Sequence, residues 1–238
     1  MSEPTVCCIM LTRDRPRMAE RAIRSFLAQT YERKCLLVAN SGSQSIFTVA
    51  TRWPGIREMF TYSGISIGEA RNAAIGCARD RYCVDIIAHW DDDDWSHPNR
   101  IAEQVSVLGN TRGAEVTGYS DLVFWDSRNQ AAWLYTKAPN ETSPMPGTTL
   151  CYWRRTWEAR PFPPVNKGED NQWLRGPNGQ APLNAAPVSF ANIEPRMIAE
   201  IHGGNTCSYI PVEDRRNQQW HRRPDLDEWA RERMELLK

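Results

Sequence analysis

One short stretch of the sequence constrains the fold more than any other. The apolar run Val84 to Trp90 has the length and composition of a buried strand, and it leads directly into four consecutive aspartates, Asp91 to Asp94. Like charges repel one another, and the repulsion grows as the local dielectric falls. Four carboxylates at the end of a core strand therefore predict a compensating cation, and a divalent metal is the natural candidate.

Strand-like and helix-like segments alternate along the first half of the chain. Apolar runs predict strands over 5–11, 35–39, 57–61 and 84–90. Apolar residues at helical spacing predict helices over 16–27, 68–78 and 98–108. This alternation is typical of an α/β fold with a mostly parallel, Rossmann-like sheet flanked by helices, in which ligands bind outside the carboxyl ends of the strands.

The second half of the chain follows a different pattern. The segments 121–126 and 131–136 predict an antiparallel hairpin, so the sheet is expected to be mixed. Further strands are expected over 148–153 and 197–201, the latter being the last, whereas the Pro- and Ala-rich segment 181–188 is expected to be irregular. A terminal helix capped by Asp225 is expected to close the chain.

Composition narrows the class of protein. The 238 residues fit one large α/β domain with a C-terminal extension better than two small domains. Lysine plus arginine equals aspartate plus glutamate at 29 each, so net charge does not indicate a nucleic-acid partner. Seven cysteines without a C-x-x-C pair favour reduced thiols and a cytoplasmic location. No apolar stretch is long enough to predict a transmembrane segment.

Asp91 and Asp93 form a D-x-D pair. Two carboxylates so placed can reach one hard cation, Mg²⁺ or Mn²⁺, and leave its other positions to phosphate oxygens. The alternatives are an acidic, solvated turn and a calcium-binding loop that only stabilises the fold. The position at the end of a buried strand in an alternating α/β pattern favours the catalytic interpretation.

The order of several segments resembles the family-2 glycosyltransferases. The segments are Thr12 to Pro16, Ile23 to Tyr31, Gly68 to Ala74, Trp90 to Trp95, Gly147 to Leu150, Phe162 and Gly168 to Asp170, so the resemblance covers roughly residues 5 to 205. It implies an inverting enzyme with the type A glycosyltransferase fold. A domain over 1–210 is then expected, with a nucleotide-binding half (about 1–110) and an acceptor-binding half (about 111–210). An extension over 211–238 would follow it.

The resemblance also implies roles for residues that would bind the donor, a nucleotide sugar. Thr12 and Arg13 would form the pocket for base and ribose, and Arg71 would bind the nucleotide or its phosphates, which its planar donors suit. Asp91 would lie near the ribose and the metal, and Asp93 would be the direct metal ligand. Asp92 is counted with the donor-binding residues, either facing solvent or behind the metal ligands, and Asp94 is given a supporting role.

The resemblance assigns the chemistry to Glu169 and Asp170. Asp170 would act as general base, removing the proton of an acceptor hydroxyl while that oxygen displaces the nucleotide with inversion. The metal would stabilise charge on the leaving diphosphate. Taken alone, the pair Glu169-Asp170 is only the acidic first turn of a helix, and its place after the aspartates favours the catalytic role.

Two histidines lie near the expected site. His202 follows the strand expected over 197–201, and a ring nitrogen there could complete the metal shell. The alternative is a histidine that holds a loop by hydrogen bonds. His89, directly before the aspartates, is expected in the core or behind the metal ligands. Of Trp153, Trp157 and Trp173, which could form a platform for an acceptor sugar, at least two are expected in the core.

One departure from the family pattern concerns the donor nucleotide. Where the family usually carries an acidic pair, this chain has Asn40 and Ser41. The Asn40 carbonyl could still accept a hydrogen bond from uracil, so a UDP-sugar is the expected donor. The other functions considered are a nucleotidyltransferase and a non-catalytic module that binds nucleotide or sugar. The acceptor stays open among a glycan, a lipid-linked intermediate, a protein, a modified nucleobase and a small metabolite.

Overall fold

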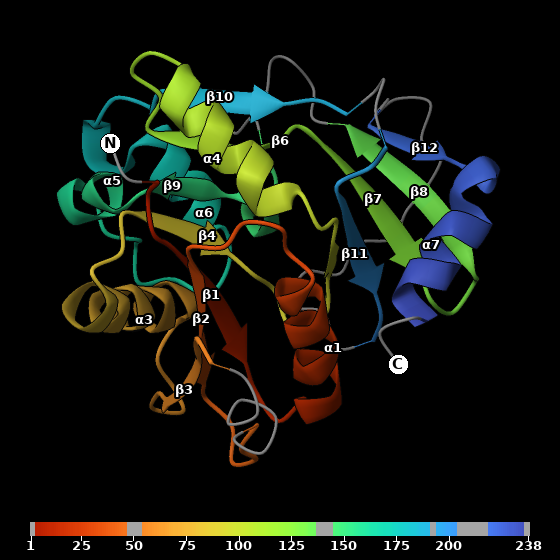
Figure 1. The fold of residues 1–238 in the computed structure, drawn as a ribbon, viewed down its shortest axis with the longest axis horizontal. Helices are drawn as coiled ribbons and strands as arrows, with labels where there is room; N and C mark the ends of the chain where they lie inside the picture. The colour runs from red at the N-terminus through yellow and green to blue at the C-terminus, as the bar shows by residue number, and fades with distance from the viewer. Residues whose placement is uncertain (1–2, 47–53, 137–144, 191–193, 204–218, 236–238) are drawn as a thin grey trace.

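The computed structural model describes residues 3–46, 54–136, 145–190, 194–203 and 219–235. Two sheets organise this part of the chain (Figure 1). The larger sheet has the strand order β10-β6-β9-β4-β1-β2-β3. Its strands are β1 (Val6–Thr12), β2 (Lys34–Asn40), β3 (Ile56–Phe60), β4 (Ile86–His89), β6 (Val116–Tyr119), β9 (Cys151–Trp153) and β10 (Ala185–Val188). The expected α/β fold, a mostly parallel mixed sheet flanked by helices, is therefore confirmed.

The first four strands of this sheet are parallel, whereas β9 runs antiparallel to both β4 and β6. Side chains alternate between the two faces along β1, as they must in a strand. Val6, Cys8 and Met10 pack on one side with helices α1 (Pro16–Leu27) and α4 (Arg100–Asn110). Cys7 and Ile9 pack on the other side with α3 (Ile67–Tyr82), α5 (Arg154–Ala159) and α6 (Glu169–Arg175). Both faces of the sheet are thus covered.

The smaller sheet has the order β12-β8-β7-β11-β5. Its strands are β5 (Trp95–Ser96), β7 (Asp121–Asp126), β8 (Ala131–Thr136), β11 (Met197–Ile201) and β12 (Trp220–Arg222). The expected hairpin is confirmed as β7 and β8, with Asp121 opposite Thr136. Helix α7 (Asp227–Glu235) packs against this hairpin, at the right of Figure 1. Strand β12 pairs with β8, so the described part of the segment 211–238 adds to the smaller sheet.

Four local expectations are corrected. The segment 181–188 is not irregular throughout, because β10 pairs in parallel with β6 at the edge of the larger sheet. Pro187, which has no N–H to donate, is tolerated on such an edge strand. The strand expected over 148–153 begins only at Cys151, after a 3₁₀ turn over Gly147–Thr149. The terminal helix begins at Asp227 and not at Asp225, and β11 is followed by one more strand.

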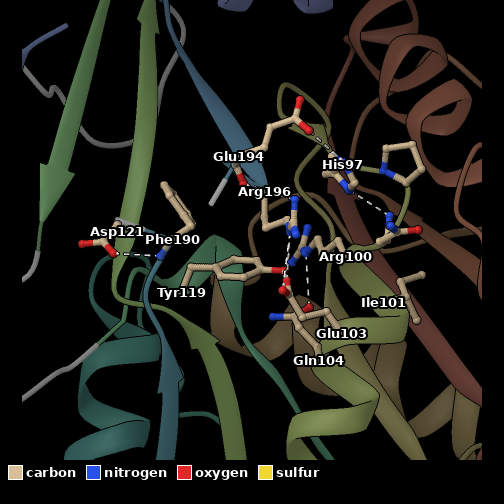
Figure 2. Close-up of polar contacts among 12 residues, drawn as sticks. His97, Arg100, Ile101, Glu103, Gln104, Tyr119, Asp121, Phe190, Glu194 and Arg196 are labelled. Atoms are coloured by element: carbon tan, nitrogen blue, oxygen red, sulfur yellow. Dashed lines mark hydrogen bonds and ion pairs between the residues drawn. The ribbon is translucent and has the colours of Figure 1, made fainter. Parts of the chain in front are cut away.

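A polar network ties α4 to the connections of the smaller sheet (Figure 2). Glu103 of α4 accepts hydrogen bonds from the Tyr119 hydroxyl at 2.6 Å and from Arg196 Nε at 3.3 Å. His97 Nε2 lies 3.4 Å from a Glu194 oxygen. The His97 contact fixes the loop between β5 and α4 to the segment before β11, and the Arg196 contact fixes that segment to α4.

Candidate functional site

A cleft of about 510 Å³ lies at the carboxyl ends of β1, β2 and β4. Its walls come from both sheets: the larger sheet contributes the loops after β1 and β4, and the smaller one contributes side chains of β7 and β11. Helix α6 closes another side with its first turn. The cleft therefore lies where the alternating sequence pattern predicts a ligand site, outside the carboxyl ends of the strands.

Asp91, Asp93 and Asp94 form a compact group of carboxylates in this cleft. One oxygen from each lies within 4.8 Å of the others, and Asp93 and Asp94 are 9% and 6% exposed. Three carboxylate oxygens at this spacing fit a hard divalent cation such as Mn²⁺ or Mg²⁺. The turn after β4 also brings Asp94, expected from the sequence to have only a supporting role, into the same group as Asp91 and Asp93.

Electrostatics within this group favour a bound cation. Burial raises the pKa of Asp91 and raises that of Asp94 well above its ordinary value, and repulsion from Asp93 raises both further. Thr148 Oγ1 donates a hydrogen bond to Asp94 at 2.5 Å and partly opposes this effect. Burial would also raise the pKa of Asp93, but His202 and Arg15 more than offset it, and the pKa is lowered.

Asp92 is not part of this group and is 1% exposed, so it does not face solvent. Thr12 Oγ1 donates a hydrogen bond to it at 2.6 Å, and Arg15 pairs with it at 2.8 Å. Burial and the charge of Asp93 raise its pKa to about 7, although Arg15 lowers it. Asp92 thus fixes the loop after β1 against the loop after β4, and that contact explains its burial.

Arg71 of α3 is buried, with 6% exposure, although helical periodicity places it on the polar face of the helix. Its Nη2 lies 3.3 Å from a Glu169 oxygen, and its guanidinium stacks over the Phe162 ring at 5.6 Å. Its Nε and Nη1 atoms are buried and have no hydrogen-bond partner among the described residues. Buried N–H groups are rarely left unpaired, and Arg71 lines the cleft, so these donors indicate an anionic ligand.

Glu169 and Asp170 begin α6 but lie in different surroundings. Glu169 is buried against Arg71, and burial raises its pKa although Arg71 opposes the shift. Asp170 is less buried and lines the cleft, where a Cβ on Gly147 would overlap its carboxylate. Gly147 is thus required for Asp170 to lie against the backbone of the loop that faces the aspartates.

The family model described as Glycosyl transferase family 2 matches residues 7–162. The chain belongs to glycosyl transferase family 2. The resemblance stated from the sequence segments is thereby confirmed. No curated protein matches the chain by sequence.

Solved structures similar to this family-2 chain support the type A glycosyltransferase fold. S. aureus TarS 1-349 in complex with UDP-GlcNAc has a TM-score of 0.61 and 11% identity, covering 87% of this chain and 62% of that one. Its complex with UDP has a TM-score of 0.60 and 10% identity, with coverages of 83% and 60%. Mannosyltransferase PcManGT from Pyrobaculum calidifontis, in complex with GDP-Man and Mn²⁺, has a TM-score of 0.57 and 14% identity, with coverages of 84% and 57%.

This family-2 chain thus spans about three fifths of the length of these chains. Within the described ranges, no helix combines the length and the apolar character needed to cross a bilayer.

The structure brings most predicted site residues of this family-2 chain together, but not Asn40. Thr12 and Arg13 line the cleft, whereas Asn40 is fully buried beside it. The Asn40 amide donates to Gln44 O at 2.7 Å and to Glu58 Oε1 at 2.8 Å, and its carbonyl accepts from Gly42 N. The side chain therefore holds the loop after β2 and its contact with β3, and Asn40 is not among the residues that line the cleft.

Histidine placement follows the expectations closely. His202 Nε2 lies 3.0 Å from Asp93 Oδ2, so His202 reaches the acidic group of this family-2 chain. His89 is fully buried, with its ring nitrogens near Gly147 O at 2.7 Å and Tyr152 Oη at 3.2 Å, and its core position is confirmed. Trp157 and Trp173 are core residues as well.

Sequence reasoning missed two groups that reach the cleft of this family-2 chain. Arg15 contacts both Asp92 and Asp93, and its position in the loop directly after β1 was the signal that could have found it. Thr61, just beyond β3, lines the cleft, and its hydroxyl is buried without a partner in the part of the chain that the structure describes. No sequence pattern marks Thr61, because a lone threonine after a short strand is common.

Proposed function

We propose that this chain is a metal-dependent, inverting glycosyltransferase that moves a sugar from a nucleotide sugar, with UDP as the preferred nucleotide, to an acceptor hydroxyl. One observation supports this most: a single cleft is lined by three clustered carboxylates, by an arginine whose Nε and Nη1 atoms are buried without a partner in the described part of the chain, and by a separate aspartate. The carboxylates, through a bound cation, and the arginine would hold the diphosphate of a nucleotide-sugar donor. The separate aspartate would accept the proton of the acceptor hydroxyl during transfer.

The diphosphate would be held from two sides. Asp91, Asp93 and Asp94 would hold Mn²⁺ or Mg²⁺, with His202 next to Asp93, and Arg71 would donate its free N–H groups to phosphate oxygens. The bound cation would stabilise the negative charge that develops on the leaving diphosphate. Glu169 would keep the Arg71 fork in place through their contact.

Asp170 would act as general base. As the acceptor oxygen forms its bond to the anomeric carbon, the bond from that carbon to the diphosphate oxygen breaks and the hydroxyl proton passes to the Asp170 carboxylate. Attack from the face opposite the leaving group inverts the anomeric configuration. The partial exposure of Asp170 suits this role, because a base has to meet an incoming acceptor.

The nucleotide is the least constrained part of the proposal. Thr12, Arg13 and Ser41 line the cleft at the ends of β1 and β2. Thr61 lines it as well, and its buried hydroxyl has no hydrogen-bond partner among the residues that the structure describes. The similar TarS structures contain UDP or UDP-GlcNAc, and the PcManGT structure contains GDP-Man and Mn²⁺. Both nucleotide classes therefore belong in the test, with UDP-sugars first.

The test measures nucleotide release when the chain is incubated with UDP-GlcNAc, UDP-glucose or GDP-mannose and MnCl₂. Turnover with one donor is expected, and Asp170→Asn should lower it about 1,000-fold, within the range for loss of a general base, while UDP binding persists. Asp80→Asn, on the exposed face of α3, is the matched control and should keep wild-type turnover.

Three other outcomes would contradict the proposal. Tight UDP binding without turnover on any acceptor class would indicate a non-catalytic binding module. Pyrophosphate release from a nucleoside triphosphate and a sugar 1-phosphate would indicate a nucleotidyltransferase. A product whose anomeric configuration, measured by NMR, matches that of the donor would exclude the single displacement.

A further inference from the structure

Arg21 of α1 is buried at a place that core packing does not explain. It is 7% exposed, and its Nη2 donates a hydrogen bond to the backbone carbonyl of Asp93 at 2.8 Å. The same nitrogen forms an ion pair with the Glu200 carboxylate of β11, and both side chains are nearly buried, at 9% and 11% exposure. Arg21 thus joins the acidic loop to the smaller sheet.

These contacts close a ring around the metal candidates. Glu200 stands two residues before His202, whose Nε2 lies 3.0 Å from Asp93 Oδ2. Arg21 holds the backbone of Asp93, Glu200 holds Arg21, and the strand end that follows Glu200 carries His202 to the side chain of Asp93. We call Arg21 and Glu200 the clamp. Its contacts join residues 72 and 179 positions apart in sequence.

Stability alone is a poor reason for such a pair. Desolvation of two buried charges offsets much of their attraction, and apolar residues of similar size often stabilise a fold as well or better. The Arg21 Nε atom is buried and has no hydrogen-bond partner within the described ranges, which adds to that cost. A role in fixing the positions of Asp93 and His202 explains the pair better than stability does.

We propose that Arg21 and Glu200 are positioning residues that set the placement of His202 relative to Asp93 and thereby the affinity for a divalent cation. The inference rests on the proposed function, since it assumes that Asp93 and His202 hold the cation. Neither clamp residue touches the cation. They fix a carbonyl and a strand end, as outer partners of metal ligands do elsewhere.

The experiment titrates MnCl₂ into the full chain and counts free Mn²⁺ by electron paramagnetic resonance, with and without UDP. Arg21→Met and Glu200→Gln should each raise the Kd for Mn²⁺ about 10-fold, the lower end of the effect of such partners. The double variant should lose no more than either single one, because the two residues act as a unit. In a His202→Ala background, Arg21→Met should add little for the same reason.

Arg24→Met is the matched control, because Arg24 lies on the same helix and forms an exposed pair with Glu20. It should leave the Kd unchanged. Clamp variants that lower the melting temperature but keep the Kd for Mn²⁺ within two-fold of wild type would overturn the inference alone. Glu200→Gln, which keeps the side-chain shape, decides the case if Arg21→Met does not fold. Failure of the wild type to bind Mn²⁺ would overturn the metal-dependent function and the inference with it.

Discussion

Two buried arginines of this chain have opposite surroundings. Arg100 of α4, 1% exposed, bonds with every nitrogen of its guanidinium: Nε to Gln104, Nη1 to Ser96, and Nη2 to the carbonyls of His89 and Thr148. It also stacks over the Trp90 ring at 5.0 Å. Arg71 of α3, 6% exposed, has a similar stacking contact, but two of its nitrogens have no partner within the described ranges.

The difference separates architecture from ligand binding. All guanidinium nitrogens of Arg100 have partners inside the fold, next to the strand that leads into the aspartates. Arg71 lines the cleft, and its Nε and Nη1 atoms are buried without a partner among the described residues. An unpaired buried donor costs more than a paired one returns. The same substitution at the two positions should therefore affect different properties.

Arg100→Lys should have the largest effect, and on stability. A lysine keeps the charge but cannot reproduce the planar fork, so buried carbonyls of His89 and Thr148 lose a donor. We expect a loss of about 3 kcal/mol in the free energy of unfolding, typical for hydrogen bonds to a charged group. The melting temperature should fall by about 9 °C for a chain of this size. A change below 2 °C would show that Arg100 is not structural.

Arg71→Lys should have a smaller effect, and on nucleotide affinity. Losing one charge-assisted hydrogen bond to phosphate weakens binding by about 1.5 kcal/mol, so the Kd for UDP, measured by calorimetry, should rise about 10-fold. The lysine can still face Glu169, so the melting temperature should stay close to that of the wild type. Unchanged UDP affinity together with a large loss of stability would place Arg71 in the same class as Arg100.

Periodicity and chain order were enough to predict several strands and the acidic group from the sequence. The apolar runs found β1, β2, β4 and the hairpin of β7 and β8, and the like-charge argument found the acidic group. Neither predicted the direction of individual side chains. Arg71 lies on a helix face that periodicity predicts to be exposed, but Glu169 of α6 contacts it there. The Asn40 amide donates hydrogen bonds to Gln44 and Glu58, so it is directed to its own loop and β3.

The contacts that sequence could not predict are those between distant segments. Arg21 and Glu200 are 179 residues apart, and no local pattern relates α1 to β11. The pairing of β10 with β6 depends in the same way on which edge of the sheet remains available. Such contacts follow from the packed fold and not from spacing in the chain.

Two buried aspartates, Asp121 and Asp94, differ in their partners as the two arginines do. Asp121, 4% exposed, accepts hydrogen bonds from Ser189 and from the backbone N–H of Phe190, as Figure 2 shows for Phe190. Asp94, 6% exposed, receives a bond from Thr148 but lies among other carboxylates that raise its pKa. Asp121 is thus paired within the fold, whereas burial and the neighbouring carboxylates disfavour a negative charge on Asp94.

The smallest effect we predict is that of Asp94→Asn. Because burial and the charges of Asp93 and Asp91 disfavour ionised Asp94, removing its charge should leave the melting temperature at pH 8 without metal equal to that of the wild type or higher. The stabilisation by MnCl₂ should shrink, since a 10-fold rise in Kd costs about 1.4 kcal/mol of it at saturating metal. Asp121→Asn is the control, and should lower the melting temperature while keeping the shift with MnCl₂. If instead Asp94→Asn destabilised the protein and left that shift intact, Asp94 would belong with Asp121, as a residue of the fold and not of the metal site.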